Sequence, residues 1–265
     1  MRITYRHHDN KQYWTHRWDS IAVDAPMSNT NAYPLKYALM TVTGKEGKIV
    51  EAGCGAGRIL RYFHDRGYDI FGFDFIPSVI QKLKETDAVL QVDVGDITQL
   101  QYPDRTFTYF LAYGLYHNLE GQALEKALDE TVRVMVPGGK ICASFRADNW
   151  QTRWTDWLTE RRRSKQFGPS TATVFHKLNL TKDELVRMFR AHGFAPETVI
   201  PVENMPILYK FRFFRAASHK DFDENKGRKE GYRLSRLGTF LQNTFIRLFP
   251  DQFCNVYVFI GTKTR

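Results

Sequence analysis

Cysteine is scarce in this sequence, and no run of apolar residues is long. The 265 residues contain three cysteines, Cys54, Cys142 and Cys254, which lie far apart in the chain. Their number and spacing exclude a disulfide framework and give no zinc-site pattern, so we interpret them as buried, reduced thiols and expect no metal site. No segment approaches the roughly 20 apolar residues of a membrane span, and the polar N-terminus lacks a signal-peptide pattern. We therefore expect a cytoplasmic protein with a single domain over residues 1–265.

Acidic residues are fewer than basic ones. The sequence has 38 Lys and Arg against 29 Asp and Glu, which gives a formal net charge of +9. Much of the excess lies in residues 159–166 and 205–252. Such clustering is typical of a solvated basic face, and also of a surface that attracts the phosphates of a substrate, a nucleic acid or an anionic membrane. Charge alone leaves both interpretations open.

Short apolar runs alternate with segments of helical periodicity. The predicted strands are residues 49–52, 68–74, 89–96, 106–114, 140–145, 197–203 and 254–262. Helices are predicted after the first two strands, over 121–135 and over 181–194, where Thr181 and Glu184 form a capping-box pattern. This alternation predicts an α/β fold with a parallel, doubly wound sheet that has helices on both faces.

A glycine-rich loop, "VEAGCGAGR" (50–58), follows the first predicted strand. Gly53 and Gly55 fill the first two places of the dinucleotide fingerprint G-x-G-x-x-G/A, but Arg58 stands at the third. The loop also lacks the lysine of a Walker phosphate-binding loop. The spacing is G-x-G-x-G instead, which weakens both phosphate-binding interpretations.

This loop and four later segments resemble the motifs of the class I S-adenosylmethionine-dependent methyltransferases. The segments are "IVEAGCGAG" (49–57), "GFD" (72–74), "GDI" (95–97), "LQYPDRTFTYFLAYGLYHNL" (100–119) and "VRVMVPGGKICASF" (132–145). The resemblance covers about residues 48–146 and the closing strands, with Thr108 where the family often has Asp. It implies a Rossmann-like, seven-stranded, mostly parallel sheet with an antiparallel last strand, and S-adenosylmethionine as cofactor.

The resemblance also implies which residues of the glycine loop meet the methionine part of the cofactor. Gly53, Gly55 and Gly57 let the backbone pass close to it. Glu51, at the end of a buried strand, interacts with the cofactor's ammonium group through water. The alternative for Glu51 is a carboxylate that accepts hydrogen bonds from local backbone N–H groups.

The adenosine part is assigned to residues after the second and third predicted strands. Asp74 lies 21 residues after Gly53, close to the spacing of about 20 in such a βαβ unit, and can accept both ribose hydroxyls. Phe75 covers an adenine face, while Asp96 accepts from the adenine amino group and Ile97 supplies a backbone contact. The alternatives are a simple strand-end turn acid at Asp74 and a rival acceptor, Asp93.

The tip of the fourth predicted strand, "AYGLYHN" (112–118), is expected to face the methyl acceptor, because ligands bind at the carboxyl ends of such strands. His117 is the candidate general base, since its ordinary pKa suits proton removal near neutrality. Tyr113, on the cofactor side, and Tyr116, as a second candidate catalytic residue, are expected to form site walls. The alternative for His117 is a polar lining residue.

Three segments lie outside the shared core, and we expect them to be a cap over the site: the N-terminal residues 1–40 and the helical insertions 147–180 and 205–252. Trp14 and Trp18 either fold over the cofactor or only pack against other residues of the protein. Residues 232–249 have apolar residues at helical spacing beside three arginines: Leu237, Leu241, Phe245 and Leu248 beside Arg233, Arg236 and Arg247. Their pattern favours a helix packed on the core, or a basic amphipathic helix at a membrane or a lipid-linked substrate.

These patterns predict a methyltransferase that acts on a small-molecule, glycan or lipid-like acceptor at oxygen or nitrogen. An anionic or lipid-linked substrate is compatible with the basic segments. One alternative is methylation of RNA or DNA, although "AYGL" (112–115) replaces the Asn/Asp-Pro-Pro-aromatic signature of amino-directed enzymes. Another is a non-catalytic protein that binds S-adenosylmethionine. The sequence leaves the acceptor and the oligomeric state open.

Overall fold

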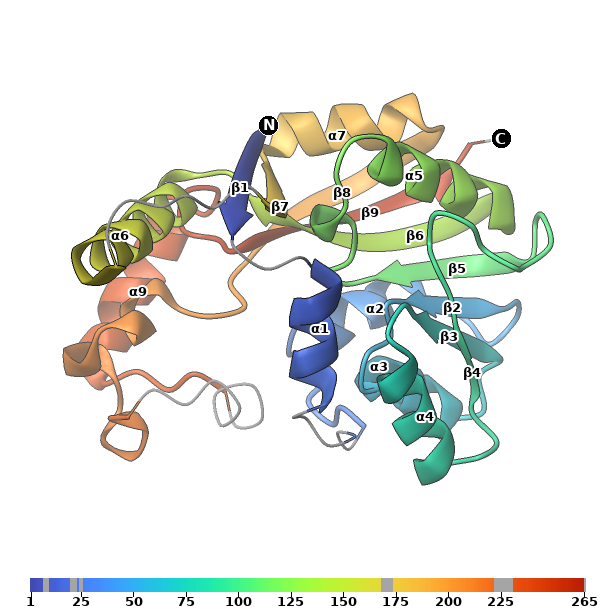
Figure 1. Cartoon of the computed structure of the whole chain (residues 1–265), viewed down its shortest axis with the longest axis horizontal. Coiled ribbons are helices and arrows are strands. Elements are labelled where there is room, and N and C mark those ends of the chain that lie inside the picture. Colours follow the sequence, from blue (N-terminus) through green and yellow to red (C-terminus); the bar gives the residue numbers. More distant parts are fainter. Residues whose placement is uncertain (7–9, 20–22, 24–25, 168–173, 222–230, 265) are drawn as a thin grey trace. The chain divides into compact units, whose positions relative to one another are not determined.

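The computed structural model describes residues 1–6, 10–19, 23, 26–167, 174–221 and 231–264. The chain forms two compact units. The first contains Met1–Arg146, Thr171–Ile200 and Val258–Arg265, and the second contains Ala147–Ser170 and Pro201–Tyr257. The first unit holds the sheet, and the second holds helix α6, three short 3₁₀ turns and helix α9 (Figure 1).

The described residues form a nine-stranded sheet. Seven strands follow the order β1-β7-β6-β5-β2-β3-β4, while β9 pairs with β6 and with β8. The strands are β1 (Arg2–Arg6), β2 (Ile49–Ala52), β3 (Ile70–Asp74), β4 (Gln91–Val94), β5 (Phe107–Ala112), β6 (Met135–Ala147), β7 (Val174–Leu180), β8 (Phe194–Val202) and β9 (Val256–Lys263). The pairs β2–β3, β2–β5, β3–β4 and β5–β6 are parallel. The predicted doubly wound, mostly parallel sheet is therefore confirmed.

The central strands are apolar along almost their whole length. All four residues of β2 are buried, as are five of the six in β5. Such continuous burial is typical of parallel strands that are covered on both faces. Figure 1 shows the helices that cover the sheet: α5 and α7 lie on one face of the sheet, and α3 and α4 lie on the other.

Six of the described helices belong to this unit, and two of them, α4 and α7, begin at a recognisable local signal. The six are α1 (Asn10–Asp19), α2 (Leu35–Thr41), α3 (Arg58–His64), α4 (Pro77–Thr86), α5 (Gln122–Val134) and α7 (Lys182–Ala191), with a 3₁₀ turn η1 (Tyr116–Asn118) after β5. Pro77 occupies the first turn of α4, where its missing N–H costs nothing. Thr181 and Glu184 form the predicted capping box of α7.

Two strands were not predicted. β1 pairs with β7 in antiparallel register, from Arg2 opposite Asn179 to Arg6 opposite Val174. Thus the sheet has nine strands rather than seven, and parts of the predicted cap segments 1–40 and 147–180 belong to it. The reason is a pairing between residues 168 to 177 positions apart, which leaves no local pattern. Other parts of the cap segments, residues 7–9, 20–22, 24–25, 168–173 and 222–230, lie outside the described residues.

The second unit is built from α6 (Trp150–Phe167), η2 (Ile207–Lys210), η3 (Arg212–Phe214), η4 (Ala217–His219) and α9 (Arg236–Leu248). In α9 the buried residues are Gly238 and Gln242, whereas Leu237 and Leu248 are exposed. An added Cβ at Gly238 would lie 2.7 Å from the Phe214 carbonyl oxygen, so the helix backbone packs directly on η3. The Gln242 side chain donates to Glu203 and accepts from the Leu208 N–H. None of the described helices is long and apolar enough to cross a membrane.

Candidate functional site

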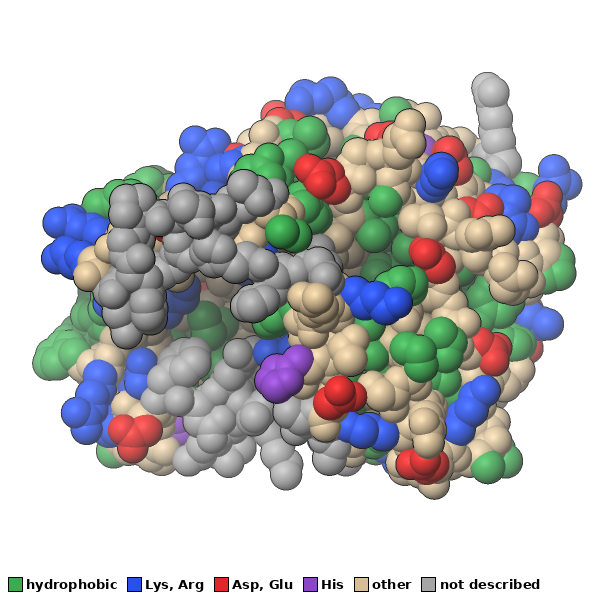
Figure 2. All heavy atoms as spheres, in the orientation of Figure 1, with side chains coloured by type: hydrophobic (Ala, Val, Ile, Leu, Met, Phe, Trp, Pro, Cys, Tyr) green, Lys and Arg blue, Asp and Glu red, His purple; other side chains and the backbone are tan. Residues whose placement is uncertain are grey.

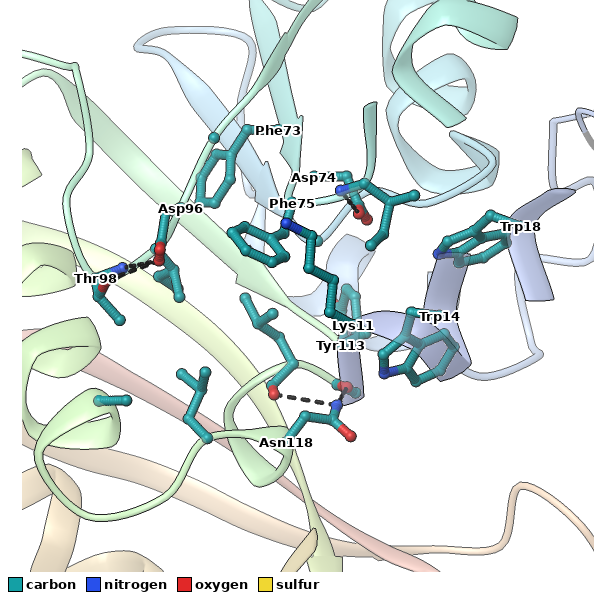
Figure 3. Close-up of a pocket in the computed structure, with 18 residues that line it drawn as sticks. Lys11, Trp14, Trp18, Phe73, Asp74, Phe75, Asp96, Thr98, Tyr113 and Asn118 are labelled. Atoms are coloured by element: carbon teal, nitrogen blue, oxygen red, sulfur yellow. Dashed lines mark hydrogen bonds between the residues drawn. The ribbon is translucent and has the colours of Figure 1, made fainter. Parts of the chain in front are cut away.

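A cavity of about 370 Å³ opens at the carboxyl ends of the central strands. Chain order reverses at β2, which has β3 on one side and β5 on the other, and ligands of open α/β sheets bind at such a point. The cavity is lined by Lys11, Trp14, Trp18, Gly53, Phe73, Asp74, Phe75, Ile76, Gly95, Asp96, Ile97, Thr98, Tyr113, Gly114, Leu115, Asn118, Leu119 and Ala123 (Figure 3). The loops after β2, β3, β4 and β5 all contribute, so the strand ends predicted to form the site do meet.

The carboxylate of Asp74 is held in a fixed position at the end of β3. One oxygen accepts from the Gly55 N–H at 3.0 Å, and the other accepts from the Ile76 N–H at 3.0 Å. Burial raises the pKa of Asp74, and the hydrogen bonds from Ile76, Gly55 and Phe75 oppose that rise. Each carboxylate oxygen has a second lone pair for another donor, which suits a pair of neighbouring hydroxyls.

Phe75, Asp96 and Ile97 line the same cavity. Phe75 is 46% exposed, and the Lys11 ammonium lies 4.9 Å from the centre of its ring. One oxygen of Asp96 accepts from both the N–H and the hydroxyl of Thr98 at 2.8 Å, which fixes the carboxylate at the cavity (Figure 3). Asp93, the rival to Asp96, is an exposed residue that pairs with Lys84 and does not line the cavity.

The glycine loop packs closely on its neighbours, and each glycine meets a different group. All three have positive φ angles, a region that favours glycine. Gly53 lines the cavity, whereas an added Cβ would lie 2.5 Å from the Trp18 ring at Gly55 and 2.6 Å from Leu83 at Gly57. Gly55 and Gly57 therefore make room for helices α1 and α4, and Gly53 is the member of the three that faces the cavity.

Helix α1 supplies one wall of the cavity. Trp14 and Trp18 stack with ring centres 6.0 Å apart, and both line the cavity with Lys11. The Lys82 ammonium on α4 donates to the carbonyl oxygens of Trp18 and Asp19, which ties the end of α1 to the sheet unit. The aromatic pair was a candidate cover in the sequence, whereas Lys11 was missed because a single lysine in a polar segment carries no signal.

Comparison with known proteins agrees with this geometry. Residues 50–143 match the family model of a methyltransferase domain. The chain aligns with a chain of the complex that contains the Haloferax volcanii Trm112 methyltransferase activator, with a TM-score of 0.62, 16% identity, and coverage of 98% of this chain and 100% of that one. The matched residues 50–143 include the loops after β2, β3, β4 and β5 that line the cavity, and over this segment the chain is similar to the S-adenosylmethionine-dependent methyltransferases.

Curated proteins similar to this chain align over part of their length. Malonyl-[acyl-carrier protein] O-methyltransferase of Salmonella typhimurium is 32% identical over 109 residues, which are 39% of this chain and 41% of the relative. Demethylmenaquinone methyltransferase of Paenarthrobacter aurescens is 28% identical over 149 residues, 54% of this chain and 52% of the relative. The matches thus span about half or less of these relatives.

Glu51 is not among the residues that line the cavity. Its side chain is buried, and one carboxylate oxygen accepts from the Leu60 N–H at 2.7 Å. Burial raises the pKa of Glu51 to about 8, against the opposing effects of the Leu60 hydrogen bond and the Arg58 charge. The structure thus contains the local backbone bond that the sequence offered as the alternative, and the predicted water-mediated contact with the cofactor stays a prediction.

The two tyrosines after β5 face different surroundings. Tyr113 lines the cavity as predicted, with its hydroxyl donating to the Cys142 sulfur at 3.2 Å. The prediction for Tyr116 is wrong. Its side chain is fully buried, its ring stacks on Phe145, and its hydroxyl lies 2.6 Å from that of Thr131. A 3₁₀ turn repeats every three residues, so Leu115 and Asn118 share the cavity face while Tyr116 points into the core.

His117 occupies the third face of the same 3₁₀ turn and does not line the cavity. Its ring contacts Phe145, and its Nδ1 atom is buried with no hydrogen-bond partner in the described part of the chain. Burial lowers the pKa of His117 to about 3, and the nearby positive charges of Arg146, Lys177 and His176 add to this effect. These observations contradict the prediction of a general base that titrates near neutrality.

We expect the His117→Ala variant to retain turnover within about tenfold of the unchanged protein, far from the 10²–10⁴-fold loss of a missing general base. An imidazole whose pKa is lowered to about 3 is already neutral between pH 6 and 8, so the pH–activity profile should keep its shape there. The measurement is turnover against pH for both proteins. A loss of about 10²-fold or more, together with a missing limb near neutrality, would restore His117 as the base.

Proposed function

We propose that this protein is an S-adenosylmethionine-dependent methyltransferase, which transfers a methyl group to an oxygen or nitrogen atom of a small-molecule, glycan or lipid-like acceptor. The observation that carries the proposal is the Asp74 carboxylate, held by two backbone N–H groups at the mouth of a cavity whose walls are largely apolar. When bound, S-adenosylmethionine supplies an electrophilic methyl group, and the acceptor atom that takes it releases its proton.

In this proposal the chain's residues bind and orient the cofactor. The Asp74 oxygens accept from both ribose hydroxyls, while the Phe75 ring lies against the adenine. Asp96 accepts from the adenine amino group, and Ile97 supplies a backbone contact. The backbone at Gly53 lies close to the methionine part of the cofactor. A cavity of about 370 Å³ has the size of a small-molecule site.

The acceptor end of the site is assigned to the loop after β5, where Tyr113 and Asn118 line the cavity. The Asn118 amide donates to the carbonyl oxygens of Gly114 and Leu115, which holds this loop in place. The carboxylates in the described lining are Asp74 and Asp96, both already assigned to adenosine. We therefore infer that no carboxylate of the described lining is left to act as a base, and that catalysis rests mainly on positioning and on exclusion of water by Trp14 and Trp18.

Two relatives have different acceptors in their names, malonyl-[acyl-carrier protein] and demethylmenaquinone, so the acceptor class needs a direct test. Transfer of a labelled methyl group from S-adenosylmethionine into a fractionated cell extract provides it, with Asp74→Ala as the negative control. The proposal expects label in small solutes, glycans or lipids. Label confined to RNA or DNA would replace it with the nucleic-acid alternative.

A further inference from the structure

Helix α9 turns apolar side chains toward solvent. Leu237 is 51% exposed, Phe240 is 68% exposed and Leu248 is 62% exposed. The buried positions of the helix are instead Gly238 and Gln242, which are held by contacts with η3, Leu208 and Glu203. Leu237, Phe240 and Leu248 are therefore not part of the core of the second unit.

These three residues share one face of the helix. Positions 240 and 248 follow position 237 by three and eleven residues, which is close to one and three turns of 3.6 residues. Arg236 and Arg247, also eleven residues apart, form a parallel row along one edge of this face, and both are exposed. The α9 sequence contains no acidic residue. The result is an apolar stripe with a basic edge, which we call the α9 face.

Exposed aromatic side chains beside arginines also occur on η3 and α6. Phe213 on η3 is 72% exposed, next to the exposed Arg212. On α6, Trp150 and Trp157 are each 52% exposed, and the Arg161 guanidinium lies 5.1 Å from the Trp157 ring centre. In Figure 2, hydrophobic and basic side chains lie together at the left rim, where Figure 1 draws α6 and α9.

Aromatic contacts join the two helices. Phe253 packs against Trp150 of α6 at 5.5 Å and stacks on Phe245 of α9 at 4.9 Å between ring centres. The second unit as a whole contains 15 Lys and Arg against 9 Asp and Glu. It therefore carries +6 of the net charge of +9. The exposed apolar groups lie in the more basic of the two units.

We propose that the α9 face docks on the surface of an anionic lipid bilayer. A helix that lies in the membrane interface places Leu and Phe among the acyl chains, while arginines at its edge reach the lipid phosphates. A nucleic acid would account for the arginines but not for three large apolar side chains that are more than half exposed. An acidic protein would require no continuous apolar stripe beside the basic row.

Sedimentation with lipid vesicles tests the proposal on the full chain. The protein should bind vesicles of phosphatidylcholine mixed with phosphatidylglycerol, should bind pure phosphatidylcholine far less, and should dissociate as salt is raised. Arg236→Glu combined with Arg247→Glu should reduce the bound fraction about tenfold or more. Phe240→Ser combined with Leu248→Ser should reduce it similarly, because the apolar contact is lost.

Matched variants on the sheet unit separate this face from general charge and hydrophobicity. Arg187→Glu with Arg190→Glu changes two exposed arginines of α7, and Val89→Ser changes an apolar residue that is 70% exposed. Both should leave vesicle binding unchanged, and melting temperature should report that every variant is folded. Equal binding to both vesicle types, no binding to either, or equal losses in the control variants would overturn the proposal. So would binding of an RNA oligonucleotide that Arg236 and Arg247 support while vesicles are ignored.

Discussion

Replacement of Asp74 by alanine is expected to weaken S-adenosylmethionine binding about 10- to 150-fold, which corresponds to about 1.5–3 kcal/mol for hydrogen bonds to a charged group. The expectation follows from the two backbone N–H groups that fix the carboxylate oxygens at the end of β3. Calorimetric titration of the purified variant measures the loss.

Asp93→Ala is the matched control for this variant. Asp93 is the neighbouring acid on β4, two-thirds exposed and paired with Lys84 at 3.6 Å, and its loss should leave the affinity within about twofold, as for a surface ion pair. A folded Asp74→Ala protein with unchanged affinity would remove Asp74 from the cofactor site. Loss in both variants would indicate a general charge effect instead.

Gly57→Ala is expected to lower the free energy of unfolding by about 2–5 kcal/mol, the sum of backbone strain and overpacking. Gly57 has a φ angle of +73°, and an added Cβ would lie 2.6 Å from Leu83, a fully buried residue of α4. Leu83 is held within the core and has little room to move. Urea denaturation measures the change.

Gly67 offers a control with the same backbone strain. Its φ angle is also +73°, but the nearest atom to an added Cβ is the Lys45 ammonium nitrogen at 3.8 Å, the end of a flexible side chain. Gly67→Ala should therefore cost about 1–2 kcal/mol, which is the strain alone. Equal losses at the two positions would show that the contact between Gly57 and Leu83 contributes nothing to the requirement for glycine.

Local signals predicted the part of the fold that positions the cofactor. Buried apolar runs separated by helical segments gave β2, β3 and β5 and the helices between them, because strands covered on both faces have a distinct composition. The spacing from Gly53 to Asp74 then placed a carboxylate at the edge where the strand ends meet. Both features depend on residues close together in the chain.

Features that depend on distant residues were not predictable in the same way. β1 and β7 pair residues that are 168 to 177 positions apart, and neither strand has a pattern that reveals its partner. His117 looked like a base because its own residue type was considered without Arg146, His176 and Lys177, which lie on other strands and lower its pKa. In α9 the apolar periodicity left open whether the leucines pack on the core or lie at a surface, and in the structure a glycine and a glutamine are the buried positions.

Calorimetric titration of the unchanged protein with S-adenosylmethionine, S-adenosylhomocysteine and NAD tests the central claim most directly. The G-x-G-x-G loop with Arg58 at the third dinucleotide position, together with the Asp74 carboxylate at the cavity, predicts that both adenosyl ligands bind and that NAD does not. Binding of NAD with no heat from either adenosyl ligand would contradict the assignment of this site to S-adenosylmethionine.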